Sequence, residues 1–121
     1  MKYEVHNTSR ANLICTCSVA DAFFSRLKGL MFKSSLPRDE GLLIEFSPLS
    51  RSRSIHGFFM RFPIDLIFIN EDLKVVEIET LYPWRYYSPR KGCKWVLEVN
   101  KGVAKEKEIE IGDELEFKSI P

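Results

Sequence analysis

The chain has 121 residues, of which 45% are apolar and 29% charged. This length fits one domain, residues 1–121, with a core of its own, and the composition is that of an ordinary globular protein. The net charge of +1 does not by itself predict binding to nucleic acid or to a membrane. No segment approaches the roughly eighteen consecutive apolar residues of a membrane span, and no apolar region follows the N-terminus as in a signal peptide. We therefore expect a cytoplasmic protein that does not enter a membrane.

Two short strands are expected at the start of the chain, over residues 2–6 and 11–17, around a polar turn. The apolar spacing then becomes helical, which predicts one helix over residues 19–29. The apolar residues of this helix share one face: Ala20, Phe23, Phe24 and Leu27.

The rest of the chain reads as further short strands separated by polar loops. The predicted strands are 42–46, 55–59, 64–70, 74–81, 95–99 and 114–118. Pro63 cannot donate to a central ladder, so it separates or bends the two strands on either side of it. One helical turn is expected within 102–108, and the loops 47–54 and 82–94 are long and polar. About eight strands with few helical crossovers favour a mostly β (α+β) fold, a small antiparallel or mixed barrel-like sheet with one N-terminal helix.

Several apolar strings occur in a characteristic order along the chain. They are RLKGLMF (26–32), GLLIEF (41–46), HGFFMRFPIDLIFIN (56–70), VLEVNKG (96–102) and IGDELEF (111–117). Together they resemble the family called domain of unknown function 192, and the segment from 81 to 102 is similar to its archaeal branch. The resemblance implies a compact, mostly β, barrel-like fold with one N-terminal helix. It implies no established reaction, cofactor or catalytic residue.

The most apolar stretch, residues 54–70, contains three polar side chains that could form a site. Strand alternation puts His56 on one face and both Arg61 and Asp65 on the other. A bend at Pro63 could bring Arg61 and Asp65 together beside the histidine, in the pocket of an enzyme acting on a small polar ligand. In the structural interpretation, Asp65 accepts backbone N–H groups or pairs with Arg61. We expect Asp65 to be mainly structural and Arg61 to face a ligand.

The loop 82–94 combines four cations with several aromatic residues and contains no acid. The segment 47–61 adds three arginines, again without an acid, whereas residues 98–121 hold seven acids and four bases. These loops predict a binding module that recognises an anionic small molecule or an acidic protein surface. A nucleic-acid-binding β barrel is the alternative, less favoured at this low net charge. The candidate binding residues are His56, Arg61, Asp65, Trp84, Arg85, Tyr87 and Arg90.

Three cysteines raise the question of a metal site. Cys15 and Cys17 share one face of a predicted strand, and with Cys93 and a histidine they would supply four soft ligands. However, zinc sites use wider spacing than C-x-C, and unpaired cysteines are commonly buried. No metal site is predicted, and the cofactor remains unknown. The common phosphate, dinucleotide, zinc-protease and serine-hydrolase motifs are absent from the sequence. We expect a monomer with reduced thiols.

Overall fold

The structure is a computed structural model that describes residues 2–20, 36–47, 53–57 and 60–121. Short strands dominate these ranges, as the alternation of apolar and polar residues predicts. The elements are β1 (Lys2–Asn7), β2 (Asn12–Ala20), β3 (Glu40–Glu45), β4 (Ile55–His56), β5 (Ile64–Ile69), β6 (Val75–Leu81), β7 (Tyr86–Tyr87), β8 (Trp95–Asn100), α2 (Val103–Glu106) and β9 (Leu115–Ile120).

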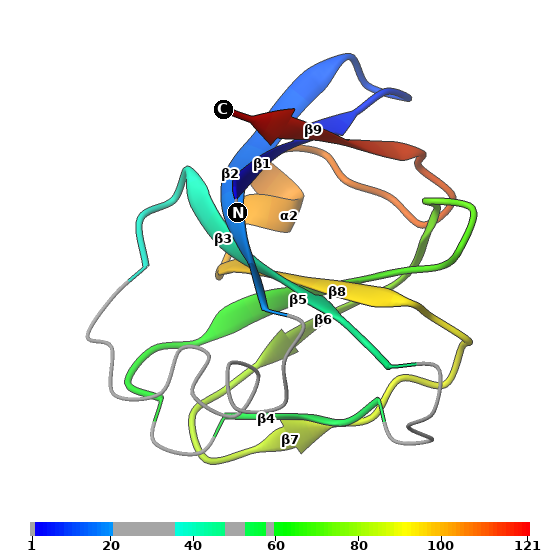
Figure 1. The fold of residues 1–121 in the computed structure, drawn as a ribbon. Helices are drawn as coiled ribbons and strands as arrows, with labels where there is room; N and C mark the ends of the chain where they lie inside the picture. The colour runs from blue at the N-terminus through cyan, green and yellow to red at the C-terminus, as the bar shows by residue number, and fades with distance from the viewer. Residues whose placement is uncertain (1, 21–35, 48–52, 58–59) are drawn as a thin grey trace.

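Seven strands form one mixed sheet in the order β6-β5-β8-β3-β2-β1-β9, and β4 pairs with β7 in a separate small sheet (Figure 1). Among the strand pairs that the structure describes, β2 and β3 alone run parallel. The large sheet curls until its two edge strands meet at one bridge, Lys74 to Glu114, where the amide of Leu115 also donates to the carbonyl of Leu73 at 2.8 Å. The mixed, mostly β architecture is therefore confirmed, but the sheet is not a closed barrel. Because β1 lies beside β9, Lys2 is opposite Ile120.

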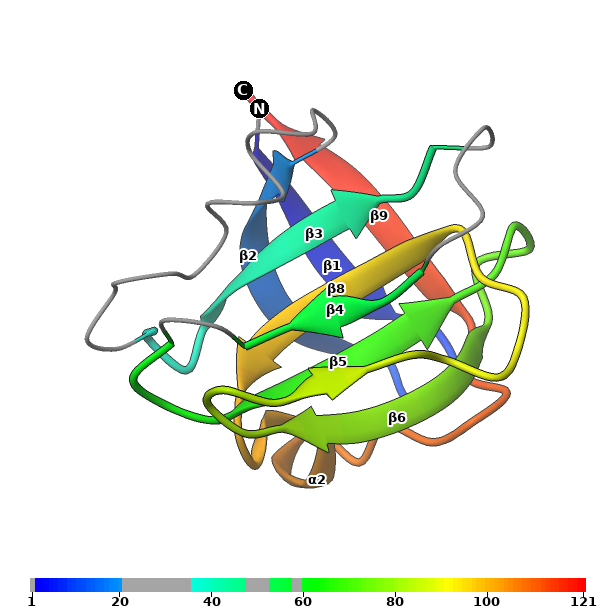
Figure 2. The ribbon, with the colours of Figure 1, turned by 90° about the horizontal axis from the view of Figure 1, so that it is seen from below.

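Each face of the large sheet has its own apolar core. The first core lies on the face toward α2, which covers one end of the curl (Figure 1), and it includes Ile67, Leu97 and Val103. The second core lies on the opposite face of β5, β8 and β3, beneath β4 and β7 (Figure 2), and it includes Ile44 and Phe68. Since β5 is covered on both sides, all six of its residues are buried.

The predicted helix over residues 19–29 is not borne out. Residues 19 and 20 belong to β2, because the strand continues past residue 17 in register with β3. The rest of the predicted helix lies outside the described residues. The helical turn expected within 102–108 is confirmed as α2. In the described ranges, no helix is long and apolar enough to cross a membrane.

The stretch around Pro63 also differs from its prediction. The structure assigns β4 to Ile55–His56 and places it in the small sheet. Residues 58 and 59 of the predicted strand 55–59 lie outside the described residues. The partner of β4, β7, lies within the segment 82–94, which was predicted as a loop. A strand of two residues is too short to leave an alternation pattern in the sequence.

Candidate functional site

The small sheet brings two of the predicted binding segments together. Ile55 is paired with Tyr87, and His56 is paired with Tyr86. Ile55 is buried, and the ring of Tyr87 packs 5.8 Å from that of Phe68 in β5, so this pair faces the second core. Alternation then directs His56 and Tyr86 away from the large sheet, and Tyr86 is 70% exposed. The outward face of β4 and β7 is thus formed by two predicted segments that are 30 residues apart.

The turn before β7 is held against Gly57. The amide of Gly57 donates to the carbonyl of Arg85 at 2.7 Å, and the amide of Trp84 donates to the carbonyl of Gly57 at 2.8 Å. A Cβ atom at residue 57 would lie 2.8 Å from the carbonyl oxygen of Tyr82, which is why glycine is needed here. Trp84 adopts a φ of 65°, an uncommon conformation for a bulky residue, and its side chain is 60% exposed. This turn presents Trp84 and Arg85 at the surface.

Glu77 in β6 anchors the segment that follows β7. Its Oε2 accepts a hydrogen bond from the Tyr87 hydroxyl at 2.5 Å, and its Oε1 accepts from the amides of Arg90 and Lys91 at 2.6 and 2.8 Å. Burial acts to raise the pKa of Glu77, but these hydrogen bonds outweigh burial and lower it. The same bond to Glu77 raises the pKa of Tyr87 to about 12. Glu77 is therefore an ionised structural acceptor, and Tyr87 uses its hydroxyl within the fold.

The cations of the described residues form two groups, those with a carboxylate partner and those without one. Lys94 belongs to the first group, since its Nζ lies 3.9 Å from Glu45. Arg10 pairs with Glu110 and Asp113, Arg38 with Glu106, and Lys118 with Glu116. By contrast, Arg85, Arg90 and Lys91 are exposed, and none of them forms an ion pair with a carboxylate of the described residues. The backbone amide of Arg90 binds Glu77, while its guanidinium acts on Glu77 through its charge without an ion pair. These cations are left available to an external anion.

The trio His56, Arg61 and Asp65 does not come together. Asp65 lies on the face of β5 that carries Ile67, whereas β4 covers the opposite face. The sheet itself therefore stands between Asp65 and His56. Arg61 is exposed just before β5, and within the described residues it forms no ion pair.

Asp65 instead accepts hydrogen bonds that connect β5 to β6 and to α2. Its Oδ1 accepts from the Thr80 hydroxyl at 3.0 Å, and its Oδ2 accepts from the amides of Gly102 and Ala104 at 3.0 and 3.1 Å. Those two amides open α2, so the buried carboxylate caps this helical turn as a side chain from a distant strand. The structural interpretation of Asp65 is in accord with these bonds.

The cysteines lie on different sides of the sheet. Cys15 and Cys17 are buried in the first core, while Cys93 packs against the second. Burial raises the pKa of Cys15 to about 12 and that of Cys17 to about 11. Such thiols are poor nucleophiles and poor metal ligands near neutral pH.

Glu98 is a buried acid that the sequence interpretation missed. It lies in β8 between Leu42 and Leu66 of the neighbouring strands, and its residue surface is 4% exposed. No donor of the described residues bonds to its carboxylate, and burial raises its pKa to about 8. The signal was the apolar run around it, WVLEVN, which is typical of a strand covered on both faces. Glu77 had no such signal, because its partners are 10 to 14 residues further along the chain.

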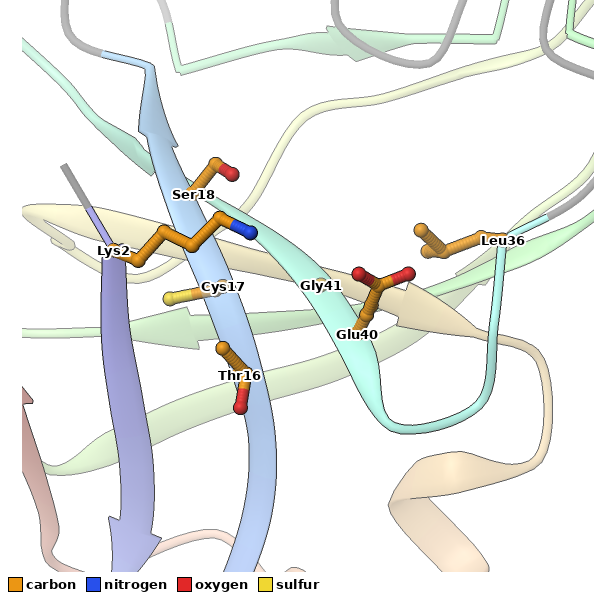
Figure 3. Close-up of a pocket in the computed structure, with 7 residues that line it drawn as sticks. All are labelled: Lys2, Thr16, Cys17, Ser18, Leu36, Glu40 and Gly41. Carbon is orange, nitrogen blue, oxygen red and sulfur yellow. The ribbon is translucent and has the colours of Figure 1, made fainter. Parts of the chain in front are cut away.

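A small pocket lies on β2 and β3, away from the surface formed by β4 and β7. Lys2 and Glu40 stand on opposite sides of it, with Ser18 nearby (Figure 3). Its volume of about 90 Å³ corresponds to a few water molecules and falls below the usual size of a metabolite site. The size of this pocket therefore does not favour it as a metabolite site.

Comparison with known proteins identifies relatives over most of the chain. The model of the family DUF192, described as an uncharacterised ACR, matches residues 5–117. A UPF0127 protein of Pyrococcus furiosus is 41% identical over 100 residues, covering 81% of this chain and 83% of the relative. A UPF0127 protein of Pyrococcus horikoshii is 39% identical over 101 residues, covering 82% and 84%.

Two crystal structures share the fold. A candidate transcription regulator of Sinorhizobium meliloti 1021 superposes with a TM-score of 0.84 at 27% identity, covering 97% of this chain and 94% of the other. A protein of unknown function from Novosphingobium aromaticivorans superposes with a TM-score of 0.81 at 26% identity, covering 96% and 84%. The family match over residues 5–117, together with the curled mixed sheet, establishes that this chain belongs to the DUF192 family.

Proposed function

We propose that the protein is a small binding module whose β4–β7 surface recognises an anionic small molecule or an acidic protein. By β4–β7 surface we mean the outward face of these two strands with Trp84, Arg85, Arg90 and Lys91. The observation that carries the proposal is that one short segment brings together three exposed cations without an ion pair in the described residues and the exposed rings of Trp84 and Tyr86. Exposed aromatic rings beside unpaired cations suit the recognition of carboxylates and phosphates.

The enzyme alternative rests on His56, Arg61 and Asp65. It would need the three side chains to share one pocket, but Asp65 already binds Thr80, Gly102 and Ala104 on the other side of the sheet from β4. The binding module is therefore favoured. We further propose that it acts as a monomer in the reducing cytoplasm, which the buried thiols Cys15 and Cys17 support.

A charge-matched pair of variants tests the binding module. Thermal-shift measurements with citrate, inorganic phosphate and polyglutamate should show stabilisation of the parent chain, since a ligand that binds only the native state raises its apparent stability. The double variant Arg85→Ala/Arg90→Ala should lose this stabilisation. The control Lys74→Ala/Lys105→Ala removes the same charge from exposed lysines elsewhere and should keep it. Equal responses of the two double variants would refute the assignment of the surface.

Nucleic acid is a second candidate, because the structurally similar Sinorhizobium protein is described as a candidate transcription regulator. Titration with duplex and single-stranded oligonucleotides at two salt concentrations decides this case. Binding through phosphates must weaken steeply as salt rises, and it must depend on Arg85 and Arg90. Absence of binding at low salt would remove this candidate.

A further inference from the structure

A groove of about 360 Å³ runs beside β6, one of the two edge strands of the large sheet. It is lined by four consecutive residues, Val76 to Glu79, and by Tyr87, Arg90, Lys91 and Ile111. Neighbouring residues of a strand point to opposite faces of the sheet, so a groove that contacts four in a row lies along the strand's edge. Its volume is within the range of binding sites. In Figure 2, β6 is the outermost strand of this side of the sheet.

Both walls of the groove are fixed to β6. One wall is the segment 87–91, which the carboxylate of Glu77 holds through three hydrogen bonds. The other is the turn at Ile111, which is tied to β6 by the bond from the amide of Gly112 to the carbonyl of Val75 at 2.8 Å. Ile111 itself is 66% exposed, so its aliphatic side chain is accessible to a partner in the groove. The groove is thus a preformed feature of the fold.

Within the ranges that the structure describes, the free edge of β6 is hydrogen-bonded to another segment at one end. There the amide of Val75 donates to the carbonyl of Asp113 at 2.9 Å, next to the bridge between Lys74 and Glu114. Beyond this point, the stretch from 77 to 80 is bonded to β5 on one side and has no further strand beside it in the described structure. An added segment of about four residues, roughly 13 Å long, fits this stretch.

The other edge strand, β9, is protected differently. Glu116 and Lys118 are exposed on it and form an ion pair with each other at 3.5 Å, and charged residues are a common device against edge pairing. On β6, Glu77 is not available for this purpose, because it is bound to Tyr87, Arg90 and Lys91. The two edges therefore differ in the chemistry they offer to a partner.

We propose that the β6 edge is a docking site for an extended, acidic segment of a partner protein, which adds a strand to the sheet. The inference rests on the proposed function, since Arg90 and Lys91 belong to the β4–β7 surface. The backbone of the segment pairs with β6, as in other strand-addition complexes. Acidic side chains lie at Arg90 and Lys91, which lack ion pairs within the described residues, and an apolar side chain packs on Ile111. Glu79 lies beyond Glu77 along the strand and disfavours a further acid there.

Labelled synthetic peptides test this proposal on the full chain. The parent peptide has eight residues, alternating Asp with Val. One derivative is N-methylated at every Val nitrogen and the other at every Asp nitrogen, so both keep the charge of the parent. Strand addition uses the donors along only one edge of the peptide. Fluorescence anisotropy should therefore show binding of the parent and of one derivative, with the other at least about tenfold weaker. The amide resonances of residues 77–80 should shift on binding.

The side wall of the groove provides a matched pair of variants. Ile111→Asp should weaken the peptide by about tenfold or more through loss of the apolar contact and repulsion of the acids. Leu13→Asp places the same charge on another exposed aliphatic position, in β2, and should leave the affinity unchanged. Circular dichroism of both variants verifies that each is folded.

Three results would overturn the docking site. Equal affinity of both N-methylated derivatives would mean that only charge attracts the peptide, and the β4–β7 surface would then stand without strand addition. Absence of any peptide binding, with citrate still bound, would do the same. Analytical ultracentrifugation showing a dimer that the peptide dissociates would assign the β6 edge to a second copy of the chain. Failure of the β4–β7 surface itself is recognised separately, by equal anion responses of the two charge-matched double variants.

Discussion

The hydroxyl of Tyr87 donates a 2.5 Å hydrogen bond to the carboxylate of Glu77, and this bond joins the small sheet to the edge of the large one. Together with the bonds from the amides of Arg90 and Lys91 to Glu77, it links the β4–β7 surface to the groove along β6. A substitution of Tyr87 or of Glu77 should therefore alter both the β4–β7 surface and the groove.

Replacing Tyr87 by Phe keeps the ring contact with Phe68 and removes only the hydrogen bond to Glu77. We expect a loss of about 1–2 kcal/mol in the free energy of unfolding, because the bond involves a charged acceptor that is partly accessible to water. Urea denaturation measures this change. Tyr86→Phe is the control, since Tyr86 is 70% exposed and should tolerate the loss of its hydroxyl. Equal stability of the two variants would contradict the anchoring role of Tyr87.

Glu98 should make the stability of the protein depend on pH. Its pKa in the folded chain is raised to about 8 by burial, above the ordinary value of 4.5, so the folded state holds the proton more tightly. The protonated Glu98 side chain contributes fully to the free energy of unfolding below about pH 4.5. This contribution is lost as the pH rises through about 8. Glu98→Gln keeps a neutral side chain at every pH. The variant should be the more stable protein at about pH 9, by up to about 4 kcal/mol. Unfolding curves recorded across this pH range measure the difference in stability. Parallel pH profiles of the two proteins would show that Glu98 does not cause the pH dependence.

Asp65→Asn should destabilise the fold although the shape of the side chain is preserved. The amide group can accept at only one oxygen, and its NH2 would meet one of the three donors that Asp65 now binds. A cost of about 2–3 kcal/mol is expected from a buried donor left without its acceptor. Hydrogen exchange should also become faster at residues 102 and 104 at the start of α2. Asp72→Asn, at an exposed turn, is the comparison and should change little.

Gly57→Ala should displace the turn that carries Trp84. The added Cβ would lie 2.8 Å from the carbonyl oxygen of Tyr82, closer than such contacts allow, so the turn must shift. We expect a loss of about 1–3 kcal/mol and weaker binding of anions at the β4–β7 surface. Gly92→Ala is a clean control, because nothing lies within 4 Å of the corresponding Cβ position. Amide resonances of residues 82–87 that are unchanged in Gly57→Ala would contradict this expectation.

The regular strands could be predicted from the sequence because each of them pairs over at least five residues, which is long enough for alternation to be visible. Their arrangement could not. The parallel pairing of β2 with β3 requires a crossover, and a period-two pattern contains no information about strand order. β4 and β7 were missed as a pair because each has only two residues, and their contact depends on Gly57 and on packing against Phe68.

The sequence predicted which residue types the candidate site contains, but it did not predict how they are arranged in space. Loops with several cations and no acids indicated Arg85 and Arg90 as binding residues. Both are exposed and form no ion pair in the described residues. His56 and Asp65 are separated because β4 and β5 belong to different sheets, which strand parity within 54–70 did not predict. The roles of Glu77 and Glu98 depend on neighbours brought in by folding, and no local pattern identifies such contacts.

The opposition of Lys2 and Ile120 in the β1–β9 ladder has a practical consequence for protein engineering. The start of β1 and the end of β9 lie side by side (Figure 2), so a short linker could join them without disturbing a strand. New ends could then be opened in the exposed turn at residues 71–72, between β5 and β6. Such a circular permutant would keep the residues of every strand pair while removing the covalent connection between β5 and β6. It would thereby separate the covalent connectivity of the chain from the pairing that holds its sheet together.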